Sequence, residues 1–225
     1  MTEIIVALDV DSGDAAERLL DALPDVRWVK VGSVLMGREG PALLARLRAR
    51  GLSVFLDLKW HDIPNTVAGA VAAARDAGIA MATVHALGGV RMMAAAAEAA
   101  GDVAIVGVTV LTSHDAPGYD RAVGRSGTNL EHEVVRLARE AISAGLSGIV
   151  CSPRELGVVR PVVGAGRRLV VPGIRGAGDA AGDQVRTATP AEARAAGATH
   201  LVIGRPIIAA ADPLGAFTEV QRQLG

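Results

Sequence analysis

The residues best suited to chemistry are three charged side chains that follow a short apolar run. The run 52–56 is apolar apart from one serine and is short enough to be a buried strand. Asp57, Lys59 and Asp62 come after it. Side chains alternate along a strand, so Asp57 and Lys59 are expected on one face, about 7 Å apart. Because charges are rarely buried unless paired, the pattern indicates either a structural ion pair at a strand end or a row of catalytic charges.

The residues that follow predict a turn into a helix. Pro64 suits the first turn of a helix, where its missing N–H leaves no hydrogen bond unmade. Asn65 and Thr66 would then place polar side chains beside the strand ends. The stretch 57–66 therefore predicts a strand, a charged corner and a helix.

The composition limits the kind of protein. The 225 residues fit one large domain, 1–225, and the hydrophobic content of 50% is enough for a core. A formal net charge of -1 shows no excess of basic residues of the kind that binds nucleic acid. The single cysteine, Cys151, excludes an internal disulfide and suits a reducing compartment. With no signal-peptide pattern and no apolar stretch near the roughly 18 residues of a membrane span, we expect a cytoplasmic protein without a membrane partner.

Short apolar runs alternate with helical patterns along the whole chain, which predicts parallel strands with right-handed crossovers. Eight such units favour an α/β fold, a single (β/α)8 TIM barrel, over the alternative of an open, doubly wound sheet. The predicted strands are 4–8, 28–31, 54–58, 81–84, 104–110, 148–150, 168–171 and 201–203. The predicted helices are 14–22, 41–50, 65–76, 89–100, 129–144, 153–163, 190–196 and 209–224.

Polar residues lie at or near the ends of most predicted strands. Because the carboxyl ends of all strands of a barrel share one rim, these side chains are expected to meet there. The connections 113–128 and 174–188 are unusually long and also follow strands, so they are expected at the same rim. The polar residues in question are Asp9, Lys30, Asp57, Lys59, His85, Thr112, Arg175 and Arg205.

Two arginines and a glycine predict a phosphate site. The loops after the seventh and eighth strands are the usual phosphate position in these barrels. Arg175 and Arg205 supply guanidinium forks for a phosphate, and Gly204 lets the backbone approach it closely. Gln184, on the long connection between them, either hydrogen-bonds a ligand across the mouth or is a solvated loop residue.

The stretch 57–66, with the sequence DLKWHDIPNT, closely resembles the signature of orotidine 5'-phosphate decarboxylases. The resemblance extends from Asp9 to Arg205, and only Trp60 and the stretch 35–37 depart from the family's usual pattern. Neither departure changes a charged position. The other matching blocks are 7–9, 30–32, 110–113, 172–175 with Gln184, and 203–205.

The resemblance implies a reaction. It implies decarboxylation of orotidine 5'-monophosphate to uridine 5'-monophosphate and CO2 in de novo pyrimidine biosynthesis, without a metal or cofactor. Lys59 would protonate C6 of the pyrimidine, and Asp57 would face the substrate carboxylate. Lys30 and Asp62 would complete the charge network.

The resemblance also implies binding residues and a partner. Asp62 and Thr66 would reach into the site of a neighbouring subunit, so the protein would be a homodimer. Asp9 and Lys30 would contact the ribose, whereas Thr112 would contact the pyrimidine. The residues implied to bind substrate are Asp9, Lys30, Thr66, Thr112, Ser113, Pro172, Arg175, Gln184, Gly204 and Arg205.

Two alternatives stay open. The first is a metal-dependent sugar-phosphate decarboxylase or synthase of the same barrel group. Those relatives usually carry an acidic metal ligand near the end of the second strand, where this chain has Lys30. The second is a non-catalytic phosphate-binding barrel, against which the intact row of Asp57, Lys59 and Asp62 argues. His61 and His85 are interpreted as hydrogen-bonded support residues rather than acid–base catalysts.

Overall fold

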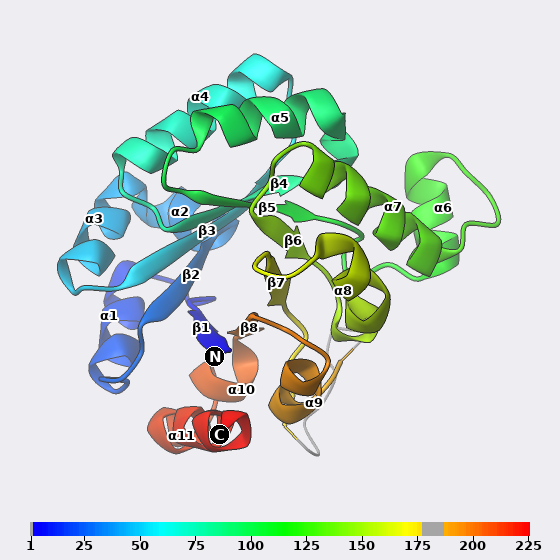
Figure 1. Cartoon of the computed structure of the whole chain (residues 1–225). Coiled ribbons are helices and arrows are strands. Elements are labelled where there is room, and N and C mark those ends of the chain that lie inside the picture. The colour runs from blue at the N-terminus through cyan, green and yellow to red at the C-terminus, as the bar shows by residue number, and fades with distance from the viewer. Residues whose placement is uncertain (1, 177–186) are drawn as a thin grey trace.

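Eight parallel strands close a barrel in the order of the chain, and helices surround it (Figure 1). The computed structural model describes residues 2–176 and 187–225. The last strand closes on the first, with Glu3 opposite His200 and Val6 opposite Ile203. The predicted (β/α)8 TIM barrel is therefore confirmed. The strands are β1 (Glu3–Ala7), β2 (Trp28–Gly32), β3 (Ser53–Trp60), β4 (Met81–His85), β5 (Ala104–Val108), β6 (Gly148–Val150), β7 (Arg168–Val171) and β8 (His200–Ile203).

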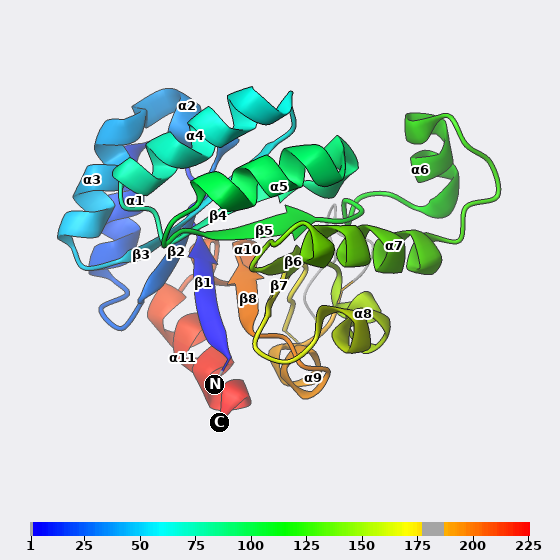
Figure 2. The ribbon, with the colours of Figure 1, turned by 45° about the horizontal axis from the view of Figure 1, so that its top comes forward.

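The predicted helices are also found, although several differ at their ends. The predicted helix 153–163 begins as the 3-10 turn η2 (Pro153–Glu155), and a second such turn, η1 (Ala86–Gly88), follows β4. Figure 2 shows the helices around the barrel from a second side. The corresponding helices are α1 (Gly13–Asp21), α3 (Pro41–Ala49), α4 (Pro64–Asp76), α5 (Gly89–Ala99), α7 (Leu130–Ser143), α8 (Leu156–Val163), α9 (Pro190–Ala195) and α11 (Pro213–Leu224).

Three helices lie outside the predicted helical ranges: α2 (Ser33–Glu39), α6 (Ala116–Val123) and α10 (Arg205–Ile208). α6 lies within the predicted long connection 113–128, where the Asp115 side chain accepts a hydrogen bond from the backbone N–H of Gly118. The predicted start of the last helix at 209 is wrong. The Asp212 side chain caps α11 at the N–H of Gly215, so the helix begins at Pro213 instead.

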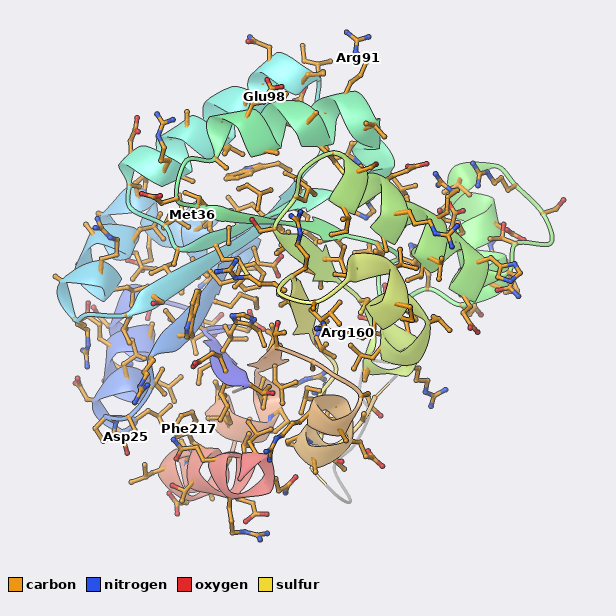
Figure 3. The ribbon with its side chains drawn as sticks, in the orientation of Figure 1. Asp25, Met36, Arg91, Glu98, Arg160 and Phe217 are labelled. Atoms are coloured by element: carbon orange, nitrogen blue, oxygen red, sulfur yellow. The ribbon has the colours of Figure 1, made fainter. Side chains whose placement is uncertain are left out.

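Apolar side chains fill the interior of the barrel beneath the carboxyl ends of its strands. A second apolar layer lies between the strands and the helices. Helix α5 illustrates the outer layer: Met92, Met93 and Ala96 are buried, whereas the exposed Arg91 and Glu98 point away from the barrel (Figure 3). No helix of the described part of the chain is both long and apolar enough to cross a membrane. The residues of the barrel interior are Ile5, Ala7, Phe55, Met81, Ala104, Val106, Val170 and Val202.

Candidate active site

The charged residues of β3 stand above the apolar interior of the barrel. Phe55 belongs to that interior, and by the alternation of a strand Asp57 follows it on the same face. The Nζ atom of Lys59 lies 2.9 Å from both Oδ1 and Oδ2 of Asp57. The carboxylate thus holds the ammonium group symmetrically at the carboxyl end of the barrel.

Lys30 of β2 extends this pair into a row of alternating charge. Its backbone is paired with Ala7 of β1 on one side and with Phe55 of β3 on the other, and both of these residues belong to the apolar interior. Its Nζ atom is 2.9 Å from Oδ1 of Asp9 and 3.9 Å from Oδ2 of Asp57. Each cation therefore has a carboxylate beside it, as the burial of Lys30 requires. We call Asp9, Lys30, Asp57 and Lys59 the charge row.

The charge row lines a cavity of about 600 Å³ at the carboxyl ends of the strands. This volume lies in the usual range of small-molecule sites. The cavity brings together most of the residues that the sequence predicts to bind or transform a substrate. Those that line it are Asp9, Lys30, Asp57, Lys59, Thr112, Pro172, Arg175, Gly204 and Arg205.

Other predicted site residues are placed elsewhere. Asp62 is exposed, and its Oδ1 atom accepts a hydrogen bond of 2.6 Å from the N–H of Ile63. Within one chain it therefore does not join the charge row. Thr66 and Ser113 are exposed as well and are not among the residues that line the cavity. Gln184 lies outside the described residues.

The two arginines of the predicted phosphate site differ in their surroundings. Arg175 is buried, and its Nη1 donates to the carbonyl oxygen of Ile174 at 2.8 Å. Arg205 is exposed, although it lines the cavity at the start of α10. Its guanidinium group is therefore well placed to meet an anion that enters from solvent.

Thr83 of β4 belongs to the site although its role was not predicted from the sequence. Its side chain is fully buried, and its Oγ1 atom donates to Oδ1 of Asp57 at 3.1 Å. The only signal in the sequence was a hydroxyl residue within the otherwise apolar run 81–84. Propensity gives such a threonine no special meaning, because β-branched residues are common in strands.

Two histidines lie beside the site with stacked rings. The ring centroids of His61 and His85 are 5.7 Å apart, with an angle of 19° between the ring planes. The pKa of His85 is lowered to about 4, chiefly by burial and also by the charges of His61, Lys59 and His114. Its Nδ1 atom accepts from the N–H of Leu87 at 3.3 Å. A neutral, hydrogen-bonded imidazole supports the interpretation of His85 as a support residue.

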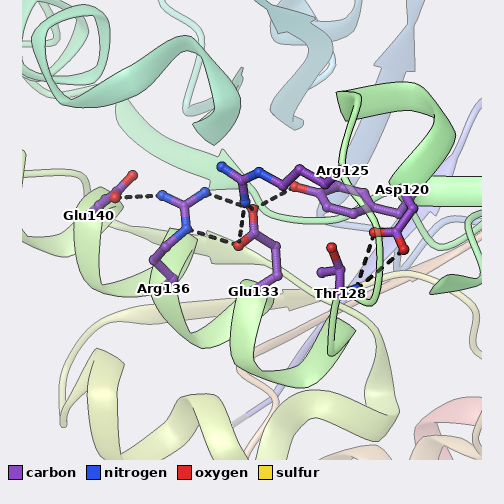
Figure 4. A network of polar contacts seen from close by, with 7 residues as sticks. Asp120, Arg125, Thr128, Glu133, Arg136 and Glu140 are labelled. Carbon is purple, nitrogen blue, oxygen red and sulfur yellow. Dashed lines mark hydrogen bonds and ion pairs between the residues drawn. The ribbon is translucent and has the colours of Figure 1, made fainter. Parts of the chain in front are cut away.

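The buried carboxylate of Glu133 joins α7 to α6 (Figure 4). The Glu133 side chain is 6% exposed and accepts from the hydroxyl of Tyr119 at 2.6 Å. Arg136 donates to it through Nε at 2.9 Å and Nη2 at 2.7 Å, and Arg125 lies 3.4 Å away. These hydrogen bonds, with the two positive charges, hold the pKa of Glu133 at about 2.

We expect Glu133→Gln to lower the free energy of unfolding by about 3 kcal/mol at pH 7, because it removes the buried charge that accepts from Tyr119 and Arg136 and leaves Arg136 with Glu140 alone. The folded pKa lies below the ordinary value of 4.5, so this contribution is present above pH 4.5 and is lost as the pH falls toward 2. Urea unfolding followed by circular dichroism at both pH extremes measures it. Glu140→Gln, which removes only the more exposed partner of Arg136, is the control and should cost less than about 1 kcal/mol. Equal losses for the two variants would contradict the prediction.

The chain is similar to known proteins over nearly its whole length. The model of the orotidine 5'-phosphate decarboxylase / HUMPS family matches residues 2–220. A protein of Halorhodospira halophila (strain DSM 244 / SL1), named orotidine 5'-phosphate decarboxylase, is 52% identical over 226 residues, which cover 98% of this chain and 95% of that protein. A protein of the same name from Anaeromyxobacter sp. (strain K) is 53% identical over 215 residues, with 95% and 94% covered.

A solved structure agrees with these sequence comparisons. The crystal structure of orotidine 5'-phosphate decarboxylase from Lactobacillus acidophilus matches with a TM-score of 0.88 and 33% identity, and the match covers 100% of both chains. Sequence and fold therefore agree over the whole barrel, and the resemblance carried by residues 57–66 is confirmed. The chain belongs to the orotidine 5'-phosphate decarboxylase / HUMPS family.

Proposed function

We propose that this chain decarboxylates orotidine 5'-monophosphate to uridine 5'-monophosphate and CO2, as an enzyme of de novo pyrimidine biosynthesis in the cytoplasm. The names of its relatives support the reaction. The observation that carries the proposal is the ammonium group of Lys59, held 2.9 Å from both oxygens of Asp57 above an apolar barrel interior.

The charge of Lys59 suits the difficult step of this reaction. Loss of CO2 from C6 leaves an electron pair on that carbon. A preorganised positive charge at that position stabilises the developing anion. The ammonium group then transfers one proton to C6, which completes the product, and the resulting amine regains a proton from solvent.

Asp57 positions Lys59 in this proposal. Both of its oxygens accept from the ammonium group, and Thr83 holds one of them. The side chain of Asp57 is 14% exposed and that of Lys59 is 39% exposed, so the carboxylate is shielded from water more than the ammonium group is. Repulsion between Asp57 and the substrate carboxylate is the second possible contribution, and it would act by raising the energy of the bound substrate.

The phosphate of the substrate would lie near Arg205 and Gly204, at the end of β8 and beyond Asp9 from Lys59. Binding energy released there is remote from the reacting carbon, so it can hold the pyrimidine against the charge row. Thr112 also lines the cavity and would contact the pyrimidine. Gln184 would bridge phosphate and base, as the family resemblance implies.

Asp62 and Thr66 would complete the site of a second subunit. Support comes from exposed apolar residues that follow the strands: Ile63, between them in the chain, is 67% exposed, and Val34, in α2 after β2, is 64% exposed. Leu87 and Val90 are exposed after β4, the neighbouring strand. Large apolar side chains gathered near one rim are typical of a protein interface. A twofold dimer would bring the same surface of two chains together and place Asp62 of each near the other's Lys59.

Mixing two inactive variants tests this shared site. If Lys59→Ala and Asp62→Ala chains exchange at equal concentrations, half of the dimers are hybrids with one intact site, so about a quarter of the wild-type activity should return. A mixture of Lys59→Ala with Asp57→Ala is the control. Each of these two substitutions inactivates the site of the chain that carries it, so a hybrid dimer has no intact site and no activity should return. Recovery in neither mixture, with subunit exchange demonstrated, would contradict a shared site.

The experiment that tests the proposed reaction follows the ultraviolet absorbance of orotidine 5'-monophosphate mixed with the protein, with and without EDTA. We expect turnover that EDTA does not change. Turnover that EDTA abolishes would favour the metal-dependent sugar-phosphate relatives. The position of Lys30 between the carboxylates of Asp9 and Asp57 argues against that alternative, because an ammonium group repels a divalent cation. Tight nucleotide binding without turnover would favour a non-catalytic barrel.

A further inference from the structure

We infer that Thr83 is a positioning residue that holds the backbone of Lys59 and the carboxylate of Asp57 in one fixed arrangement. This inference deepens the proposed function and rests on it for its kinetic consequences. Its structural content rests on three observations: the register of β3 against β4, the backbone conformation of Lys59, and the two hydrogen bonds of the Thr83 hydroxyl.

The pairing of β3 with β4 is interrupted where the charge row begins. Leu56 lies opposite Ala82, and the next paired residues are Trp60 and Val84. Three residues of β3, from 57 to 59, therefore lie opposite the single residue Thr83. A bulge of this kind redirects side chains and leaves backbone groups without their usual ladder partners.

Lys59 has an unusual backbone conformation within this bulge. Its φ angle is +51°, and it is the only non-glycine residue with a positive φ among those the structure describes. Left-handed backbone is unfavourable for a side chain such as lysine and persists only where the surroundings enforce it. The conformation therefore requires a specific contact that maintains it.

The hydroxyl of Thr83 supplies that contact. Its Oγ1 atom accepts from the backbone N–H of Lys59 at 2.8 Å, which replaces the missing ladder bond. The same oxygen donates its own hydrogen to Oδ1 of Asp57 at 3.1 Å. A hydroxyl has one hydrogen to donate, and here the acceptor is the carboxylate that holds the Lys59 ammonium. Thr83 therefore holds the backbone of Lys59 and the carboxylate of Asp57 in one arrangement.

This arrangement predicts how loss of the hydroxyl affects catalysis. Valine has nearly the same shape as threonine but can neither accept from Lys59 nor donate to Asp57. The Lys59 ammonium would then lose its fixed position relative to C6, whereas the phosphate contacts would be unchanged. We expect Thr83→Val to lower kcat roughly 10²-fold, the scale reported for small misplacements of a reacting group, with KM nearly unchanged. Thr83→Ser keeps the hydroxyl and should restore most of kcat.

Thr109 offers a matched control. It is also fully buried, follows the neighbouring strand β5, and its Oγ1 donates to the carbonyl oxygen of Val150 at 3.0 Å. Thr109→Val removes a buried hydroxyl without touching the charge row, so kcat should stay near the wild-type value. Circular dichroism and thermal unfolding establish that each variant is folded. If Thr83→Val fails to fold, Thr83→Ala replaces it.

A second measurement does not depend on activity. Lys30 and Lys59 are the only lysines in the chain, so labelling with ¹⁵N-lysine gives two backbone amide signals. We expect hydrogen exchange at the Lys59 amide to accelerate in Thr83→Val, while the Lys30 amide within β2 serves as the internal reference. Thr83→Ser should retain slow exchange.

The outcomes separate this inference from the proposed function. Failure of the wild-type protein to decarboxylate orotidine 5'-monophosphate would overturn the proposed function, and the exchange measurement would still test Thr83. A wild-type kcat in folded Thr83→Val, or unchanged exchange at Lys59, would overturn the inference. Equal losses of kcat in Thr83→Val and Thr109→Val would do the same.

Discussion

Lys59→Ala is expected to abolish turnover while the barrel stays folded. The variant loses both the positive charge that stabilises the anion at C6 and the proton that completes the product. Each of these two effects accelerates the reaction by roughly 10²-fold or more, so kcat/KM should fall by at least about 10⁴-fold. It also leaves the Asp57 carboxylate without its closest cation, beside a substrate that carries another carboxylate. Steady-state assays measure the loss, and circular dichroism verifies the fold.

Lys59→Arg separates the two contributions of this residue. Arginine keeps the positive charge but does not give up a proton at accessible pH. We therefore expect Lys59→Arg to be nearly as inactive as Lys59→Ala. Near-normal turnover by Lys59→Arg would contradict the role of Lys59 as proton donor.

Arg205→Ala is expected to lower kcat/KM by at least about 10²-fold, the scale of a lost charged hydrogen bond of about 3 kcal/mol. Arg205 is the exposed arginine of the cavity, so its guanidinium can meet the phosphate of an entering substrate. The loss should appear mainly as a higher KM. Affinity for uridine 5'-monophosphate should fall, whereas affinity for uridine, which has no phosphate, should not change.

Arg154 provides the control for Arg205. It is also an exposed arginine on a segment that follows a strand, in the turn after β6, but it is not among the residues lining the cavity. Arg154→Ala should therefore leave kcat/KM within about threefold of the wild-type value. Titration calorimetry with the two ligands and steady-state assays give the comparison. An unchanged kcat/KM in Arg205→Ala would contradict the placement of the substrate phosphate near Arg205.

Local sequence patterns were sufficient to predict the barrel and most of its charge row. Alternation along 54–58 places Phe55 and Asp57 on one face, and the strand–helix order brings the ends of all strands to one rim. Because these rules depend only on spacing, they also predicted that Asp9 and Lys30 would lie near Asp57. The largest errors at the strand ends were at Val108, where β5 ends two residues early, and at Trp60, where β3 ends two residues late.

The tertiary structure decided which partners the charged residues have. It placed Lys30 closer to Asp9 than to Asp57, turned Asp62 toward the N–H of Ile63, and brought Thr83 under the ion pair. The position of Thr83 depends on the interrupted pairing of β3 with β4, which joins residues 24 positions apart in the chain. The spacing of residues along one strand carries no information about such pairing, because register is set by contacts that form only when the barrel closes.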